Sequence, residues 1–185
     1  DESYRDFLPE TALPPHQLFN DPDWQDYVVH LYSFSKAYCV AGHRVGAMAC
    51  GPQVRTELNK VLDTMQICPP RGPLPGLTWA IDNLHDWKAN NRAIIAERAR
   101  VFREGVGQLQ DWHIDALGTY FAYIRIPEGP RDAMAVGEAL ASECGLLPLV
   151  GPFFGPGQER HLRLAFANVD LDAIAQVPAR LRALR

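Results

Sequence analysis

The chain has 185 residues, of which 47% are hydrophobic and 22% charged, and its formal net charge is −4 at pH 7. This balance is typical of a globular protein with a core of useful size. The scattered Lys and Arg residues argue against a nucleic-acid surface. No apolar run approaches the roughly 20 residues that a membrane-spanning helix needs.

The sequence of the first half predicts a polar N-terminal segment, followed by two short strands and a helix. Residues 1–26 are rich in Pro, Asp and aromatics, and they indicate a strand end, a turn and a loop. Residues 27–33 predict a buried strand and residues 44–51 a second strand, with a loop between them. Pro52 and the apolar spacing that follows predict a helix over 52–67.

The second half of the chain follows a proline-rich break at 68–76. Residues 77–110 have a helical pattern longer than a usual globular helix, so we expect one long or two abutting helices linking two lobes. The remaining predicted elements are a strand over 113–127, a helix over 131–145, a strand or edge segment over 146–154, a strand over 161–168 and a helix over 169–185. This order is typical of a small α+β lobe.

The cysteines carry no sign of a metal site. Cys39, Cys50, Cys68 and Cys144 have neither C-x-x-C nor other metal-ligand spacing. We therefore expect buried or half-buried free thiols and no bound metal. Free thiols favour a reducing compartment, and hence a cytoplasmic location.

The most informative stretch is YSFSKAYCVAGHRVG, residues 32–46. A lysine in apolar surroundings loses part of its preference for the charged form, and its neutral amine can attack a carbonyl. Beside Lys36, the hydroxyls of Ser33 and Ser35 and the fork of Arg44 could hold a phosphate. An amine next to an anion site suits a cofactor with an aldehyde and a phosphate, and pyridoxal phosphate has both.

This stretch closely resembles the lysine signature of class I/II pyridoxal-phosphate-dependent aminotransferases of fold type I. The signature has a serine three residues before the lysine and an arginine eight residues after it, and both are present. The resemblance implies that Lys36 is the catalytic residue and binds the cofactor as a Schiff base. It also implies that Ser33, Ser35 and Arg44 bind the cofactor's phosphate.

Two further motifs extend the resemblance towards both ends of the chain. D-E-S-Y supplies Asp1 and Tyr4 at the spacing with which the family contacts the pyridine nitrogen and the phenolic oxygen of the cofactor. A carboxylate there keeps the pyridinium protonated, which makes the ring an electron sink. HLRLAFAN places Arg163 where the family has the arginine that binds the substrate's α-carboxylate.

The resemblance covers essentially the whole chain and implies an α/β fold. We expect residues 1–95 to be the C-terminal part of the cofactor-binding large domain and residues 96–185 to be the small α+β C-terminal domain. The family's glycine-rich phosphate loop has no counterpart, so the sequence resembles the C-terminal half of such an enzyme, with little or no activity by itself. The implied partners are amino-acid and 2-oxo-acid substrates and a second copy in a homodimer.

Two other functions remain open at this point. The same scaffold supports pyridoxal-phosphate-dependent carbon–sulfur lyases, which the residues above do not separate from transaminases. It also occurs as an amino-acid sensor domain in transcriptional regulators. A keto-acid product formed from an amino acid would favour a transaminase.

Overall fold

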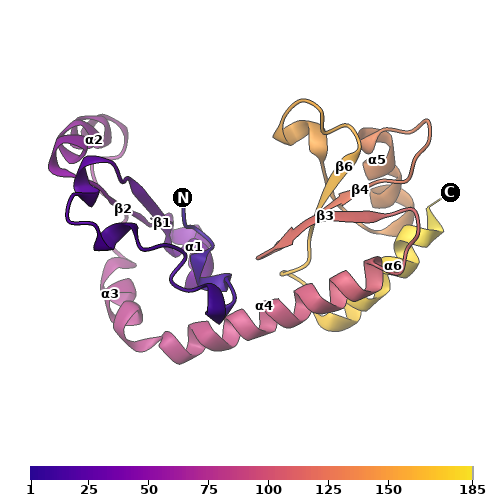
Figure 1. Ribbon diagram of the computed structural model, residues 1–185, viewed down its shortest axis with the longest axis horizontal. Helices are drawn as coiled ribbons and strands as arrows, with labels where there is room; N and C mark the ends of the chain where they lie inside the picture. The colour runs from indigo at the N-terminus through magenta and orange to yellow at the C-terminus, as the bar shows by residue number, and fades with distance from the viewer. Residues whose placement is uncertain (185) are drawn as a thin grey trace. The chain divides into compact units, whose positions relative to one another are not determined.

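The computed structural model describes residues 1–184, whose elements are shown in Figure 1. Two compact units make up the chain, Asp1–Arg92 and a second unit that begins at Ala93. The fold is mixed α/β, with one small antiparallel sheet in each unit.

The first unit is built on a two-stranded antiparallel sheet. Strand β1 (His30–Ser33) pairs with β2 (Gly46–Ala49), and Ser33 lies opposite Gly46. A one-turn helix, α1 (Phe34–Ala37), follows β1 directly, where the sequence indicated a loop. The hydrophobic core beneath it consists of Ala37, Tyr38, Val45, Leu77 and Ala80.

The predicted buried strand over 27–33 is shorter and more open than expected. Only its last four residues pair, and Val28 is its one buried side chain, whereas Val29 and Leu31 are exposed. Residues 1–26 form no α-helix, as the prolines indicated, but the strand end predicted there is wrong, since the first strand begins at His30. They form four short 3-10 turns: Arg5–Phe7, Glu10–Ala12, Leu18–Asn20 and Trp24–Asp26.

Three helices follow β2 in the chain. Helix α2 (Pro52–Met65) begins at the proline that predicted it, but its apolar residues Val61 and Leu62 are half exposed and none of its side chains is buried. The pattern over 77–110 corresponds to two abutting helices, α3 (Leu74–Asn83) and α4 (His85–Val106). The sequence pattern left open whether this region forms one long helix or two, and the structure shows two, separated at Leu84.

The second unit contains a four-stranded antiparallel sheet in the order β3-β4-β6-β5. Its strands are β3 (His113–Gly118), β4 (Phe121–Arg125), β5 (Leu149–Val150) and β6 (His161–Ala165). The prediction of one strand over 113–127 is therefore wrong, because residues 113–125 fold back as a hairpin. Thr119 adopts a left-handed conformation at φ 49° and turns the chain there.

Two capped helices cover one face of this sheet. Asp132 and Asp170 accept hydrogen bonds from the backbone at the N-termini of α5 (Ala133–Cys144) and α6 (Leu171–Ala183). Gly145 ends α5 in the left-handed conformation, as the sequence indicated. Alternate sheet residues face these helices and are buried: Ala122, Ile124, Leu162 and Leu164.

Gly151 offers a test of packing in the second unit, at the start of the 3-10 turn η6 (Gly151–Phe154). A Cβ atom here would lie 2.1 Å from the backbone oxygen of Gln158 and 2.8 Å from that of His161. Since backbone cannot move aside cheaply, we expect Gly151→Ala to lower the free energy of unfolding by about 1–3 kcal/mol. Gly118→Ala is the matched control, because no atom lies within 4 Å of its added Cβ. Equal melting temperatures for the two variants would contradict the close packing of Gly151 against the backbone of Gln158 and His161.

No helix among residues 1–184 is long and apolar enough to cross a membrane. The same residues contain no group of three or more His, Cys, Asp or Glu side chains that could hold a metal ion. All four cysteines are free, but Cys39 and Cys68 are exposed, where we expected burial.

Candidate functional site

Lys36 lies on α1, the one-turn helix that directly follows β1 in the first unit. Ser33 caps this turn, because its Oγ accepts a hydrogen bond from the Ser35 backbone N–H at 3.3 Å. The next two residues, Ala37 and Tyr38, are buried in the core of the unit. The core therefore fixes the backbone at Lys36, and the Lys36 side chain itself is half-buried.

The loop from α1 to β2 is held in an uncommon backbone conformation. Cys39 and Arg44 both have left-handed backbone angles, with φ of 54° and 53°. Non-glycine residues in this region are strained, and such strain tends to occur at functional sites. The Arg44 guanidinium donates to the Ala41 carbonyl at 2.9 Å, and Arg44 and Gly46 line a cavity of about 200 Å³.

Asp1 and Tyr4 belong to a segment that runs beside β1. The Glu2 backbone N–H donates to the Leu31 carbonyl at 2.8 Å, two residues before Ser33. The Asp1 carboxylate accepts hydrogen bonds from the backbone and the hydroxyl of Ser3, at 2.8 Å and 2.7 Å. All the predicted cofactor residues thus lie on β1, on its flanking segment or in the β1–β2 connection.

The Glu2 side chain anchors this segment to the sheet. Its carboxylate contacts the Arg5 guanidinium at 2.8 Å and the His30 ring at 3.1 Å, and it also pairs with His16. Burial alone would raise the pKa of Glu2, but the hydrogen bond from His30 and the charge of Arg5 outweigh it, so the pKa is lowered. Sequence reasoning missed this anchor, since His30 is far from Glu2 in the chain.

Asp6 provides a second anchor for the same segment. Its carboxylate accepts from the Tyr32 hydroxyl at 2.7 Å and from Lys88 Nζ at 3.2 Å, and its carbonyl accepts from Arg92 Nε at 3.0 Å. Burial and the hydrogen bond to Asp6 raise the pKa of Tyr32. Burial alone would lower the pKa of Lys88, but the charge of Asp6 outweighs it, so this pKa is raised. The segment that carries Asp1 and Tyr4 is therefore fixed both to β1 and to α4.

The lowered pKa of Glu2 predicts a pH dependence of stability. A carboxylate with a depressed folded-state pKa stabilises the fold above its unfolded pKa, and this contribution is lost as the pH falls through the folded value. We expect Glu2→Gln to lower the free energy of unfolding by on the order of 1 kcal/mol at pH 7. The difference from wild type should shrink as the pH falls from the unfolded pKa of about 4.3 through the lower folded pKa, because the wild-type carboxylate becomes protonated over this range. Urea unfolding at several pH values measures this, and a difference that does not vary with pH would contradict it.

Arg163, the predicted substrate residue, belongs to the second unit. It lies on β6, opposite Tyr123 of β4, and its side chain is on the sheet face opposite α5 and α6. Its Cζ lies 4.3 Å from the centroid of the Phe121 ring and 4.5 Å from that of Phe154. These two aromatic neighbours were not identified from the sequence, because only the strand register and the course of η6 bring them to Arg163.

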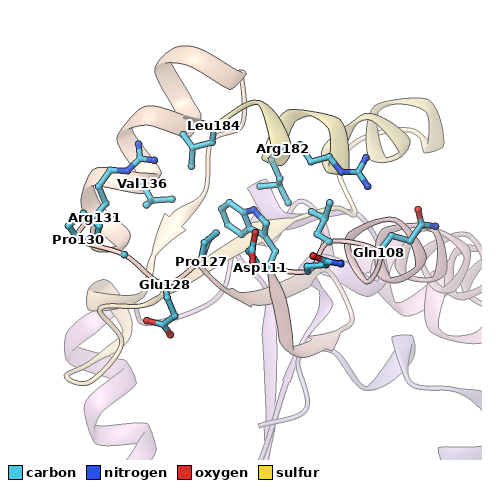
Figure 2. Close-up of a pocket in the computed structure, with 14 residues that line it drawn as sticks. Gln108, Asp111, Pro127, Glu128, Pro130, Arg131, Val136, Arg182 and Leu184 are labelled. Carbon is cyan, nitrogen blue, oxygen red and sulfur yellow. The ribbon is translucent and has the colours of Figure 1, made fainter.

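A cavity of about 600 Å³ also lies in the second unit (Figure 2). Its apolar lining includes Trp112 and Val136, and charged residues such as Asp111, Glu128 and Arg182 stand around it. None of the residues predicted from the sequence lines this cavity. We therefore do not include it in the candidate site.

Comparison with known proteins places the site in a family. The family model for aminotransferase class I and II matches residues 1–181, a span that includes all the predicted site residues. The chain belongs to the class I and II aminotransferases. Aromatic aminotransferase ISS1 of Arabidopsis thaliana is 26% identical to this aminotransferase chain over 161 residues, covering 85% of the chain and 40% of ISS1.

Solved structures confirm the fold of the aminotransferase chain. A probable N-succinyldiaminopimelate aminotransferase from Thermus thermophilus matches with a TM-score of 0.78 and 25% identity, covering 87% of the chain and 43% of that protein. LysN, an α-aminoadipate aminotransferase from another strain of Thermus thermophilus in complex with N-(5'-phosphopyridoxyl)-L-leucine, matches with a TM-score of 0.74 and 24% identity, covering 85% of the chain and 41% of LysN. The chain thus spans less than half the length of these relatives.

The residues of the first unit fit pyridoxal phosphate, the cofactor of this family. One short connection supplies an amine, two hydroxyls and a guanidinium, which is the donor set that an aldehyde and a phosphate require. Next to Arg44, a Cβ atom added at Gly46 would lie 3.0 Å from the Tyr32 carbonyl, so the two strands approach closely at this point. The donor set and the backbone that carries it are therefore consistent with the cofactor.

Proposed function

We propose that the protein is a pyridoxal-phosphate-dependent transaminase that transfers an amino group from an amino acid to a 2-oxo acid. The observation that carries this proposal is the placement of Lys36 on a core-anchored turn, between the Ser33 cap and the left-handed loop to Arg44. Membership of the aminotransferase family supports the same reaction.

Each predicted residue would have a defined role in this reaction. Pyridoxal phosphate, when bound, supplies an electron sink for the carbanion formed at the substrate's Cα. Lys36 would hold the cofactor's aldehyde carbon and, once released, move a proton to and from the substrate's Cα as base and acid. Ser33, Ser35 and Arg44 would hold the phosphate.

The other residues would tune the ring and hold the substrate. The Asp1 carboxylate would keep the pyridine nitrogen protonated, and Tyr4 would donate a hydrogen bond to the phenolic oxygen. Arg163 would bind the α-carboxylate through two parallel hydrogen bonds, which its planar fork allows.

We further propose a homodimeric, cytoplasmic protein of amino-acid metabolism, with residues 1–95 and 96–185 as parts of the large and small domains. The family resemblance supports the dimer and the domains, and four free thiols support a reducing compartment. Sedimentation velocity tests the dimer, and cell fractionation tests the location.

The direct test of the reaction is product analysis. Cofactor-loaded protein is incubated with a set of amino acids and 2-oxoglutarate, and glutamate and the new 2-oxo acids are measured. Glutamate formation with one equivalent of 2-oxo acid supports transamination. Ammonia or a released thiol without glutamate would instead indicate a lyase. The relatives described above are named as aminotransferases, which favours transamination over the lyase reaction.

A further inference from the structure

The open face of the second unit's sheet carries an arginine between two aromatic rings. The Arg163 Cζ lies over the Phe121 ring at 4.3 Å from its centroid, and over the Phe154 ring at 4.5 Å. Both distances are within the range of a cation–π contact. Both rings therefore contact the same guanidinium.

The backbone places these rings from two separate elements. Phe121 lies on β4 opposite Ala165, diagonally next to Arg163 on the same sheet face. Phe154 comes from η6, which is bounded by two glycines. Gly151 has no room for a Cβ atom, and Gly155 has φ of 140°, a conformation that L side chains rarely adopt. The course of η6, and with it the Phe154 ring, is thus fixed by the backbone.

A second row of rings supports Phe154. The Tyr123 ring meets Phe154 edge-on at 6.3 Å, stacks on His161 at 4.9 Å, and its hydroxyl donates to Gln158 at 2.7 Å. His161 in turn contacts Asp115 at 2.9 Å. Phe154 is 46% exposed, so these contacts, rather than burial in the core, hold its ring in place.

The arrangement leaves the edges of the guanidinium available. Guanidinium N–H groups point outward in the plane of the group, and among residues 1–184 the Arg163 side chain donates no hydrogen bond. Among the described residues, no carboxylate lies within 4.0 Å of Arg163, whereas Arg125 on the same face pairs with Asp115. Arg163 is therefore an oriented cation without an acidic partner in this part of the chain.

From this geometry we infer that Phe121 and Phe154 are positioning residues, which hold the Arg163 guanidinium ready to bind a planar carboxylate edge-on. The inference deepens the proposed function and rests on it for the identity of the ligand, the α-carboxylate of an amino acid. An Arg side chain that is already oriented loses less rotamer freedom when it binds, and the affinity for the carboxylate rises accordingly.

The first test is spectroscopic and uses the 185-residue chain with 3-phenylpropionate, a carboxylate that has no amino group and cannot react. The Arg163 side-chain NMR signals report ring currents from the two aromatic neighbours. We expect Phe154→Leu to move the Arg163 Hδ signals downfield and to weaken binding of the probe about tenfold. Phe154→Tyr keeps the ring and should restore both properties.

Phe153→Leu is the matched control, because Phe153 is the neighbouring residue and is 68% exposed. We expect it to leave the Arg163 signals and the affinity for the probe unchanged. The inference is overturned if the wild-type Arg163 signals do not respond to the probe, or if Phe154→Leu binds it as tightly as wild type.

The second test is kinetic and separates this inference from the proposed function. In cofactor-loaded protein, we expect Phe154→Leu to raise KM for the amino acid about tenfold with little change in kcat. If wild type binds the probe at Arg163 and Phe154→Leu weakens this binding, but no amino acid gives a 2-oxo acid, the proposed function fails and the carboxylate site stands. A fall in kcat with unchanged KM would contradict the positioning role.

Discussion

Replacement of Lys36 by alanine is expected to abolish covalent attachment of the cofactor and to lower transamination by at least about 10²–10⁴-fold, the usual contribution of a general acid–base group. The variant lacks both the amine that binds the aldehyde carbon and the group that moves the proton. Borohydride reduction of the cofactor-loaded protein followed by peptide mass analysis measures attachment independently of activity. The wild-type peptide containing residue 36 should gain the mass of the reduced cofactor, and the variant peptide should not.

Lys36→Arg is the matched control for charge. The guanidinium keeps the positive charge but stays protonated and cannot attack an aldehyde, so this variant should fail in the same way as Lys36→Ala. Both variants should fold, because the core beneath α1 is formed by Ala37 and Tyr38 and not by Lys36. Cofactor attached to another lysine in the Lys36→Ala protein would show that the assignment of Lys36 is wrong.

The second large effect is expected at Arg163. Removing one partner of a hydrogen-bonded charge pair costs about 2–5 kcal/mol, so Arg163→Gln should raise KM for the amino acid about 30-fold or more. Arg163→Lys keeps the charge but loses the planar fork, and we expect a KM between those of wild type and Arg163→Gln. Steady-state kinetics with one amino acid at saturating 2-oxoglutarate measures both.

Arg125→Gln is a useful comparison for this experiment. Arg125 lies on the same sheet and already pairs with Asp115, so it should not bind the substrate's carboxylate. We expect its KM to stay close to wild type. If Arg163→Gln and Arg125→Gln changed KM equally, the carboxylate would not be bound specifically at residue 163.

Local features of this protein could be predicted from its sequence because their causes are local. Pro52 begins α2, and Gly145 ends α5, since each residue has a backbone preference that acts within one turn. The motif around Lys36 also predicted the family, because its residues are close together in the chain. The family assignment and the mixed α/β fold were confirmed by the family model and by the solved relatives.

Other features depend on contacts between distant residues, and the sequence did not indicate them. The hairpin over 113–125 looked like one strand because its alternating pattern continues across the turn, although Gly118 stands next to Thr119 as a possible turn signal. Asp6 and Lys88 meet across more than 80 residues of chain. Phe154 reaches Arg163 through the antiparallel pairing of β5 and β6 and the course of η6.

The left-handed backbone at Arg44 implies a trade-off between stability and function at a single position. A non-glycine residue in this conformation costs about 1 kcal/mol or more relative to glycine, and Arg44 adopts it at φ 53°. Selection for stability alone would favour Gly or Asn there, at the expense of the guanidinium proposed to hold the phosphate. Stabilised variants obtained by screening for thermal tolerance would therefore be expected to lose cofactor affinity when residue 44 changes.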